Sequence, residues 1–382
     1  MAHAVRDPIE VLILAIPETA GSALYGMVDV LSAAGTIWET LAGAVPGQPL
    51  FRVRIVSPEP SPFVCGNGIP VAPALAVGED PEARIVIVPE IWLAPEASLA
   101  GRHPALMDWL RRRHRAGTVL YSACSGSILL AEAGLLDGCE ATSHWGYEGL
   151  FRRDYPKVRF RPEPNLAFAD PAGRVVTAGG TSSWHDLALH IIARHGSPAE
   201  ALRIAQVYLL KWHAEGQLPY AALVRRGPHG DAVVRRCEDL LEAHSREPGA
   251  IERVVHASGI PERTLKRRFK AATGVSLIER LQDLRVERAK RLLEAGELAV
   301  EAISAEVGYE DASFFRRLFR RRTGVGPSDY RRMFRPVAAA GMSSIMVLMA
   351  EWFDVIRWAG AIYLVVLGIR QLRGWWLRRG GA

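Results

Sequence analysis

Short, nearly continuous apolar runs alternate with amphipathic stretches through the first half of the chain. The runs have the length of buried β-strands and stop at proline, glycine or small residues. They cover residues 9–17, 51–57, 83–89, 117–124 and 173–180. The stretches between them favour helices, among them residues 24–35, 103–117 and 127–138. Buried strands alternating with helices predict an α/β domain with a flavodoxin-like, mostly parallel sheet covered on both faces.

The ends of these strands carry the residues most suited to bind a small molecule, because ligands of such sheets lie beyond the carboxyl ends of the strands. Residues 121–127 (YSACSGS) place one cysteine at a sharp turn into a helix, whose dipole would lower the thiol pKa. The candidate pocket residues are Glu18, Glu90, Cys124, Ser125, His144, Trp145 and Thr181. Trp184 is a further candidate wall, although core packing also suits it. His144 has no second histidine or carboxylate at metal-ligand spacing, so a hydrogen-bonded pocket role is favoured and neither a metal nor a cofactor is expected.

The second half of the chain is helical and contains an internal repeat. Residues 196–222 predict a helix that ends at Gly216 or Pro219, and residues 225–230 (RRGPHG) have the composition of a linker. Residues 259–276 (GIPERTLKRRFKAATGVS) recur as residues 308–326 (GYEDASFFRRLFRRRTGVG). Each copy has a short apolar helix, a glycine turn and a basic helix, which is the pattern of a helix-turn-helix. The helix at 281–293 is expected to separate the two copies rigidly.

The basic helix of each copy has one apolar face and one basic face. Leu265 and Phe269 form the buried face of the first copy, and Phe315 and Phe319 form that of the second. Arginine suits both phosphate contacts and bidentate contacts to guanine. The expected DNA-contacting residues on the other faces are Arg263, Lys266, Arg267, Ser313, Arg316, Arg317 and Arg320.

Charge separates the two halves of the chain. Residues 251–335 hold 19 Lys and Arg against 12 Asp and Glu, which indicates a polyanion-binding module or, on charge alone, a solvated helical surface. Four cysteines without C-x-x-C spacing exclude a disulfide scaffold and a structural zinc site. The first residues (MAHAVRDPIE) lack an apolar signal region, so we expect a cytoplasmic protein.

The motifs of both halves resemble known families. The segment ACSGSILLAEAGLLDG, followed by ATSHW and VTAGGTSSWHDLALHII, resembles the ThiJ/PfpI domains of the class I glutamine amidotransferase-like fold, in the version found in GlxA-type regulators. The repeat and the closing TGVGPSDYR resemble the DNA-binding domain of the AraC/XylS family. Val255 and Ser304 stand where that family usually has alanine at the helix crossing.

The resemblance implies a transcriptional regulator whose first domain senses a small molecule. Catalytic members of the ThiJ/PfpI superfamily pair the cysteine with a carboxylate from the first helix, and often with a histidine directly after it. Ser125 occupies the histidine position, and the carboxylate position falls near Ala23. Binding of an effector without catalysis is therefore favoured. The alternative is a Cys124-dependent hydrolase or amidase.

Four segments follow from these observations: 8–195, the ThiJ/PfpI-like domain; 196–230, a connecting helix and linker; 231–335, the double helix-turn-helix; and 336–382, a tail. The expected partners are double-stranded DNA, an unknown effector, a second copy of the chain and RNA polymerase.

The tail contains the uncharged run WAGAIYLVVLGI at 358–369, which is too short to cross a bilayer. A fusion or frameshift remnant, a helix on the membrane surface and a helix packing on a partner are the three interpretations of the tail.

Overall fold

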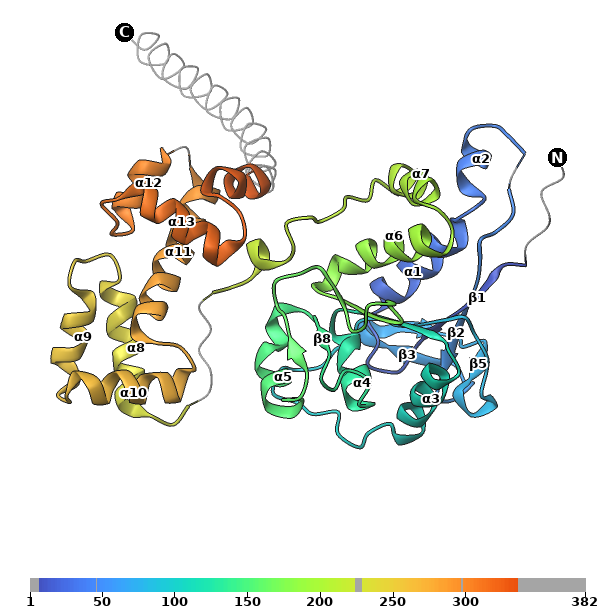
Figure 1. Ribbon diagram of the computed structural model, residues 1–382, viewed down its shortest axis with the longest axis horizontal. Helices are drawn as coiled ribbons and strands as arrows, with labels where there is room; N and C mark the ends of the chain where they lie inside the picture. The colour runs from blue at the N-terminus through green and yellow to red at the C-terminus, as the bar shows by residue number, and fades with distance from the viewer. Residues whose placement is uncertain (1–6, 46, 224–228, 297, 336–382) are drawn as a thin grey trace, which may run out of the picture. The chain divides into compact units, whose positions relative to one another are not determined.

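The computed structural model describes residues 7–45, 47–223, 229–296 and 298–335, and it divides the chain into two compact units (Figure 1). The first unit is Met1–Ala221 and the second is Ala222–Ala382. The tail expected at 336–382 lies outside the described residues. No helix in the described part of the chain is long and apolar enough to cross a membrane.

The first unit is built on a seven-stranded sheet in the order β10-β11-β7-β6-β1-β2-β5. The five predicted strands are β1 (Ile9–Leu14), β2 (Phe51–Ser57), β6 (Ile85–Val88), β7 (Val119–Ala123) and β11 (Val175–Ala178). They pair in parallel, and β5 (Leu75–Ala76) extends them in parallel, while β10 (Leu166–Phe168) is antiparallel to β11. Two small pairs lie outside this sheet: β3 (Phe63–Cys65) with β4 (Ile69–Val71), and β8 (Glu140–Ala141) with β9 (Arg159–Phe160). The predicted mostly parallel α/β fold is confirmed.

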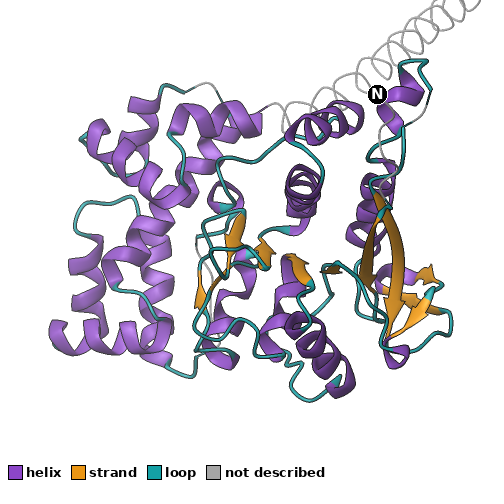
Figure 2. Cartoon of the chain, turned by 45° about the vertical axis from the view of Figure 1, so that its right-hand side comes forward, coloured by secondary structure: helices purple, strands orange, loops and turns teal. Residues whose placement is uncertain are grey.

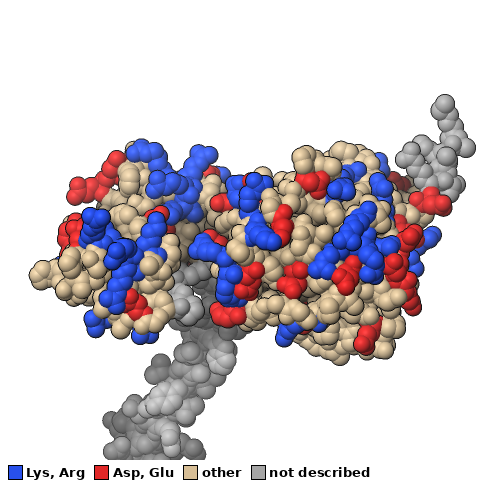
Figure 3. Space-filling view, turned by 60° about the horizontal axis from the view of Figure 1, so that its bottom comes forward, with Lys and Arg blue, Asp and Glu red and all other residues tan. Residues whose placement is uncertain are grey.

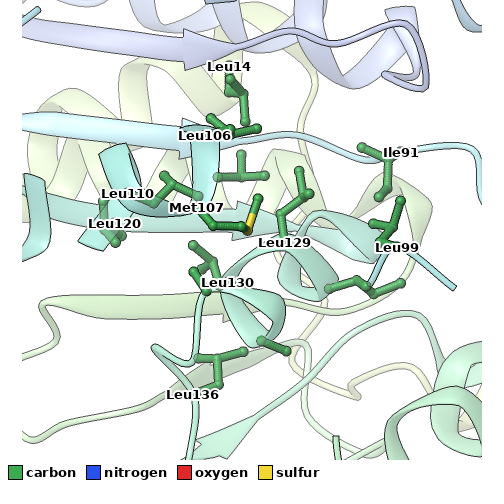
Figure 4. Packing of buried hydrophobic residues seen from close by; sticks show 14 of the residues in the cluster. Leu14, Ile91, Leu99, Leu106, Met107, Leu110, Leu120, Leu129, Leu130 and Leu136 are labelled. Carbon is green, nitrogen blue, oxygen red and sulfur yellow. The ribbon is translucent and has the colours of Figure 1, made fainter. Parts of the chain in front are cut away.

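Helices cover both faces of the sheet (Figure 2). On one face lie α1 (Gly21–Ala33), α6 (Trp184–His195) and α7 (Pro198–Tyr208), with α2 (Ile37–Leu41) beside α7. On the other face lie α3 (Pro104–Arg115), α4 (Ser127–Glu132) and α5 (Glu148–Asp154). Figure 4 shows the second of these cores, where Leu106 and Leu110 of α3 and Leu129 of α4 pack against the strands. Alternate residues of β1 enter opposite cores: Leu12 and Leu14 in one, Val11 and Ile13 in the other.

The prediction that the helix within residues 196–222 continues to Gly216 or Pro219 is wrong. Helix α7 ends at Tyr208, and Leu209 takes a left-handed conformation with φ of 54° that terminates it. Residues 209–221, called the strap below, then run without an α-helix and belong to the first unit. The polar side chains of this segment are held by distant residues described below.

The second unit consists of two similar helical halves that share one helix. The first half contains α8 (Ala232–His244), α9 (Ala250–Ser258) and α10 (Glu262–Thr273); the second contains α12 (Val300–Glu306) and α13 (Ala312–Thr323). Helix α11 (Leu277–Ala295) contributes Leu281 to the first core and Val286 and Leu293 to the second. Both halves therefore pack on one continuous 19-residue helix. It contains the helix predicted at 281–293 between the two copies of the repeat.

Candidate functional site

The turn between β7 and α4 holds Cys124 in a strained conformation. Its φ is 52°, in the left-handed region that non-glycine residues rarely adopt. Gly126 makes the turn possible, because a Cβ atom there would lie 2.4 Å from the carbonyl oxygen of Val88 and 2.5 Å from that of Pro89. The predicted sharp strand-to-helix turn is therefore present and packs directly on the end of β6.

Cys124 lies beside a hydroxyl and a carboxyl group that come from two other strand ends. Its Sγ is 4.0 Å from Thr181 Oγ1, and that hydroxyl donates a 3.2 Å hydrogen bond to Glu90 Oε1. All three residues line a cavity of about 400 Å³ together with Ser22, Trp92, His144 and Tyr147. A carboxyl group thus stands at the thiol, although it comes from the segment after β6 and not from the first helix, where Ala23 is buried.

The expectation that the helix dipole lowers the Cys124 pKa is wrong. Burial raises the pKa of the thiol to about 12, and the neighbouring charge of Glu90 adds to this shift. Helix α4 has only six residues and the side chain is 1% exposed, so desolvation outweighs the dipole. Burial also raises the pKa of Glu90, against the hydrogen bonds from Thr181 and Cys124. Both groups are therefore biased toward their neutral forms.

Two residues expected in the pocket point elsewhere. The buried Ser125 hydroxyl donates to the Ile91 carbonyl oxygen at 2.6 Å and accepts from the Ile91 nitrogen at 2.9 Å, so it fastens the turn to the segment after β6. Glu18 lies 3.5 Å from Arg102 and 3.8 Å from His103. It lines neither this cavity nor the adjoining one described next.

A second cavity, of about 490 Å³, adjoins the first and shares Ser22, His144 and Thr181 with it. Trp145 lines this second cavity, as does Trp184. The ring of His144 lies 4.7 Å from that of Trp145, and His144 Nδ1 accepts a 3.0 Å hydrogen bond from the Gly146 nitrogen. The expected residues are thus divided between two neighbouring cavities: Glu90 and Cys124 in one, Trp145 in the other, and His144 and Thr181 in both.

The strap supplies site residues that the sequence analysis did not identify. Gln217 is buried; its Nε2 donates to Thr142 Oγ1 at 3.0 Å and to the Ser143 carbonyl oxygen at 2.9 Å, and its Oε1 accepts from the Trp145 nitrogen at 3.2 Å. His213 is held by the buried carboxylate of Asp186, which lies 2.9 Å from its Nδ1. The one trace of Gln217 in the sequence is the glycine at position 179. A Cβ atom there would lie 2.6 Å from Gln217 Nε2, so a larger residue would collide with the glutamine side chain. Within the described residues, no group of three or more His, Cys, Asp and Glu side chains is arranged to hold a metal ion.

The second unit presents basic side chains on two equivalent helices. In Figure 3 this unit lies at the left, and Lys and Arg side chains form a band over its visible face. All seven expected DNA-contacting residues are exposed. They lie on α10 (Arg263, Lys266 and Arg267) and on α13 (Ser313, Arg316, Arg317 and Arg320).

One basic residue of each helix forms an ion pair, although the two acidic partners stand at non-equivalent positions. Lys266 forms an ion pair with Glu262 at 2.5 Å, and Arg316, its equivalent 50 residues later, pairs with Glu301. The neighbouring equivalents Arg267 and Arg317 form no ion pair with any described residue, so their guanidinium groups are available to an outside partner. Val255 is half-buried, and the buried Ser304 hydroxyl donates to the Tyr309 carbonyl oxygen at 2.9 Å, so neither departure disrupts the helix crossing.

Comparisons with known proteins agree with both halves of this description. Residues 11–194 match the DJ-1/PfpI family, and residues 254–333 match a helix-turn-helix domain. The chain is 30% identical over 285 residues to the HTH-type transcriptional regulator CdhR of Pseudomonas aeruginosa. The match covers 74% of this chain and 82% of CdhR. It is 26% identical over 298 residues to the regulator GlxA of Rhizobium meliloti, covering 76% and 88% of the two chains. Among solved structures, an AraC family transcriptional regulator from Pseudomonas putida matches with a TM-score of 0.43 at 17% identity, covering 53% of this chain and all of that one.

A DJ-1/PfpI unit followed by a helix-turn-helix unit defines a class of DNA-binding transcriptional regulators. The chain belongs to the HTH-type transcriptional regulators that carry an N-terminal DJ-1/PfpI domain, the family that includes CdhR and GlxA. The predicted family, fold class and regulatory role are confirmed.

Proposed function

We propose that the chain recognises its operator through α10 and α13 and that a small molecule bound beside Cys124 controls this recognition without being transformed. The observation that carries the DNA-binding half is the pair of equivalent, exposed arginines Arg267 and Arg317, neither of which forms an ion pair with a described residue. Each lies on the second helix of a helix-turn-helix, the helix that enters the major groove in this motif. Because both halves pack on α11, the two helices keep a fixed spacing on the DNA.

The cavity beside Cys124 favours binding over catalysis. A nucleophilic cysteine acts as its thiolate, whereas burial and Glu90 hold this thiol protonated near neutral pH. The cavity nevertheless offers a hydroxyl, a carboxyl group, an imidazole and aromatic walls, which are the groups that orient a small ligand.

The effector changes DNA binding only if it binds two conformations of the protein with different affinity. The strap is the element that connects the two functions in sequence, because it contacts the second cavity and ends where the first unit ends. We infer that ligand binding beside Cys124 reaches the strap through His144 and Thr181, which line both cavities.

The test is selection of genomic DNA fragments by the full chain, followed by affinity measurements across a salt series. The double variant Arg267→Ala/Arg317→Ala is expected to lose about 100-fold in affinity for the selected site and to show a shallower salt dependence. The matched control is Arg52→Ala/Arg152→Ala, which removes two exposed, ion-paired arginines from the first unit. Equal losses in both variants, or no fragment bound more tightly than random DNA, would refute the proposed DNA interface.

A further inference from the structure

The second cavity has a charge character of its own. Its lining contains no Asp, Glu, Lys or Arg, and the only side chains there that can become charged near neutral pH are the imidazoles of His144, His185 and His213. Among the lining side chains, only these imidazoles can therefore contribute a charge. The cavity also lies at the N-terminal end of the 12-residue helix α6, where the helix dipole favours an anion.

His213 is the imidazole best placed to meet an anion. Asp186, which is fully buried, accepts hydrogen bonds from the His213 backbone nitrogen at 3.0 Å and from Nδ1 at 2.9 Å. Nδ1 and Nε2 lie on opposite sides of an imidazole ring, so the bond to Asp186 directs Nε2 away from the carboxylate. The side chain is 23% exposed and lines the cavity. The hydrogen bond to Asp186 also raises the pKa of His213, against burial.

The charged and titratable groups around His213 come from two elements. Asp186 and His185 lie on α6, while Lys211, Glu215 and Tyr220 lie on the strap. Lys211 and Glu215 form an ion pair at 3.8 Å, and Tyr220 donates to Glu215 at 3.4 Å. Burial lowers the pKa of His185, which keeps that imidazole neutral beside His213. Of the two neighbouring imidazoles, His213 is thus the one whose pKa is raised.

The Trp184 wall of the cavity is held in place by its neighbours. The Trp184 ring lies directly over Gly26 of α1, where a Cβ atom would be 2.3 Å from Cη2 and 2.5 Å from Cζ2. Its other near neighbour is the His185 ring, with the centroids 3.8 Å apart. Trp145 and Tyr220 complete the aromatic lining. A flat apolar group fits against Trp184 at low entropic cost because that ring is already held in place.

We propose that this cavity binds a carboxylate with a flat apolar body, whose carboxylate oxygen accepts a hydrogen bond from His213 Nε2 while the body lies against Trp184. This inference rests on the proposed function only in treating the first unit as a ligand-binding domain. It assigns a site separate from Cys124, and the site is closed by the strap. A ligand there contacts the segment that leads out of the first unit.

The test uses the full chain and three probes of similar shape: phenylacetate, its neutral amide phenylacetamide, and the cation phenethylamine. Isothermal titration at pH 6 is expected to show phenylacetate binding at least about tenfold more tightly than the other two. Raising the pH from 6 to 9 favours the neutral imidazole, so the affinity for phenylacetate is expected to fall by at least about tenfold while that for the amide stays constant.

Two variants locate the site. His213→Gln removes the cation and is expected to lower the phenylacetate affinity at pH 6 by about tenfold and to flatten its pH profile. Gly26→Ala pushes the Trp184 ring from its place and is expected to weaken all aromatic probes. The matched control is His256→Gln, an exposed histidine of α9.

Tighter binding of phenethylamine or equal binding of the amide would overturn the proposal, and so would unchanged phenylacetate affinity in His213→Gln. Absence of saturable phenylacetate binding up to about 10 mM would also overturn it. If His213→Gln fails to fold, the comparison of acid and amide across pH in the natural chain decides the question. DNA binding measured on the same preparations separates the hypotheses: a chain that selects DNA but binds no carboxylate refutes this inference alone.

Discussion

The buried carboxylate of Asp186 accepts two hydrogen bonds from His213, one from its backbone nitrogen and one from Nδ1. This pair joins the strap to the first turn of α6, and it makes the stability of the first unit depend on pH. The hydrogen bond to Asp186 raises the pKa of His213 in the folded state. Such a shift means that the protonated imidazole is more stable in the folded protein than in the unfolded chain.

The stabilisation from His213 should therefore be complete below its unfolded pKa of about 6.5 and should disappear as the pH rises through the higher folded pKa. Urea unfolding of the natural chain and of His213→Gln, measured from pH 5.5 to 9, checks this. The difference in unfolding free energy between the two proteins is expected to shrink as pH increases. A difference that grows with pH would contradict the assigned direction of the pKa shift.

Cys124 is expected to react slowly with alkylating agents, although it lies at a turn that resembles a nucleophile site. With a pKa of about 12, it carries at pH 8 more than about 1,000-fold less thiolate than an ordinary cysteine. Cys139 is partly exposed and provides the internal control. Mass spectrometry after timed iodoacetamide treatment should show Cys139 modified first and Cys124 modified only on unfolding. Equal rates would show that the thiol is accessible and activated.

The two turn glycines of the helix-turn-helix repeat should tolerate alanine to different degrees. Both have positive φ, 68° at Gly259 and 88° at Gly308, so alanine at either position costs about 1 kcal/mol in backbone strain. A Cβ atom at Gly259 meets no atom within 4 Å, whereas at Gly308 it would lie 2.6 Å from the Arg246 carbonyl oxygen and 3.0 Å from Arg285 Cζ. Gly308→Ala is therefore expected to destabilise the second unit by about 3 kcal/mol, and Gly259→Ala by about 1 kcal/mol. Chemical unfolding of both variants measures the two losses in unfolding free energy. A larger loss for Gly259→Ala than for Gly308→Ala would contradict this prediction.

Gln217 should control the mobility of the strap. Gln217→Ala leaves the Trp145 nitrogen and the Ser143 carbonyl oxygen without their Gln217 contacts, at a cost of about 1–3 kcal/mol. The strap also contains Lys211, whose side chain is 72% exposed. Limited proteolysis with trypsin should therefore cleave after Lys211 faster in Gln217→Ala than in the natural chain. Gln206→Ala, an exposed position on α7, is the control and should leave the cleavage rate unchanged.

The sequence by itself determined the elements whose signals are local. The apolar runs located the five principal strands, and the repeat located both helix-turn-helix motifs together with the faces of α10 and α13. These features follow from the periods of strands and helices and from glycine at positive φ, all of which are encoded within a few neighbouring residues. The strand-to-helix turn at Cys124 is local in the same sense.

Tertiary structure alone decided the chemistry of the site. Thr181 reaches Glu90 across 91 residues, Gln217 reaches Thr142 across 75, and His213 reaches Asp186 across 27. The prediction for the Cys124 pKa failed because a pKa depends on everything packed around the sulfur, and the sequence shows only the neighbours along the chain. The helix was predicted to continue to Gly216 or Pro219, because the partners that hold Gln217 and His213 lie on other elements and leave no signal in the local sequence. Local patterns fix which elements form, and burial and polar contacts between distant elements fix which side chains meet and how strongly each holds its proton.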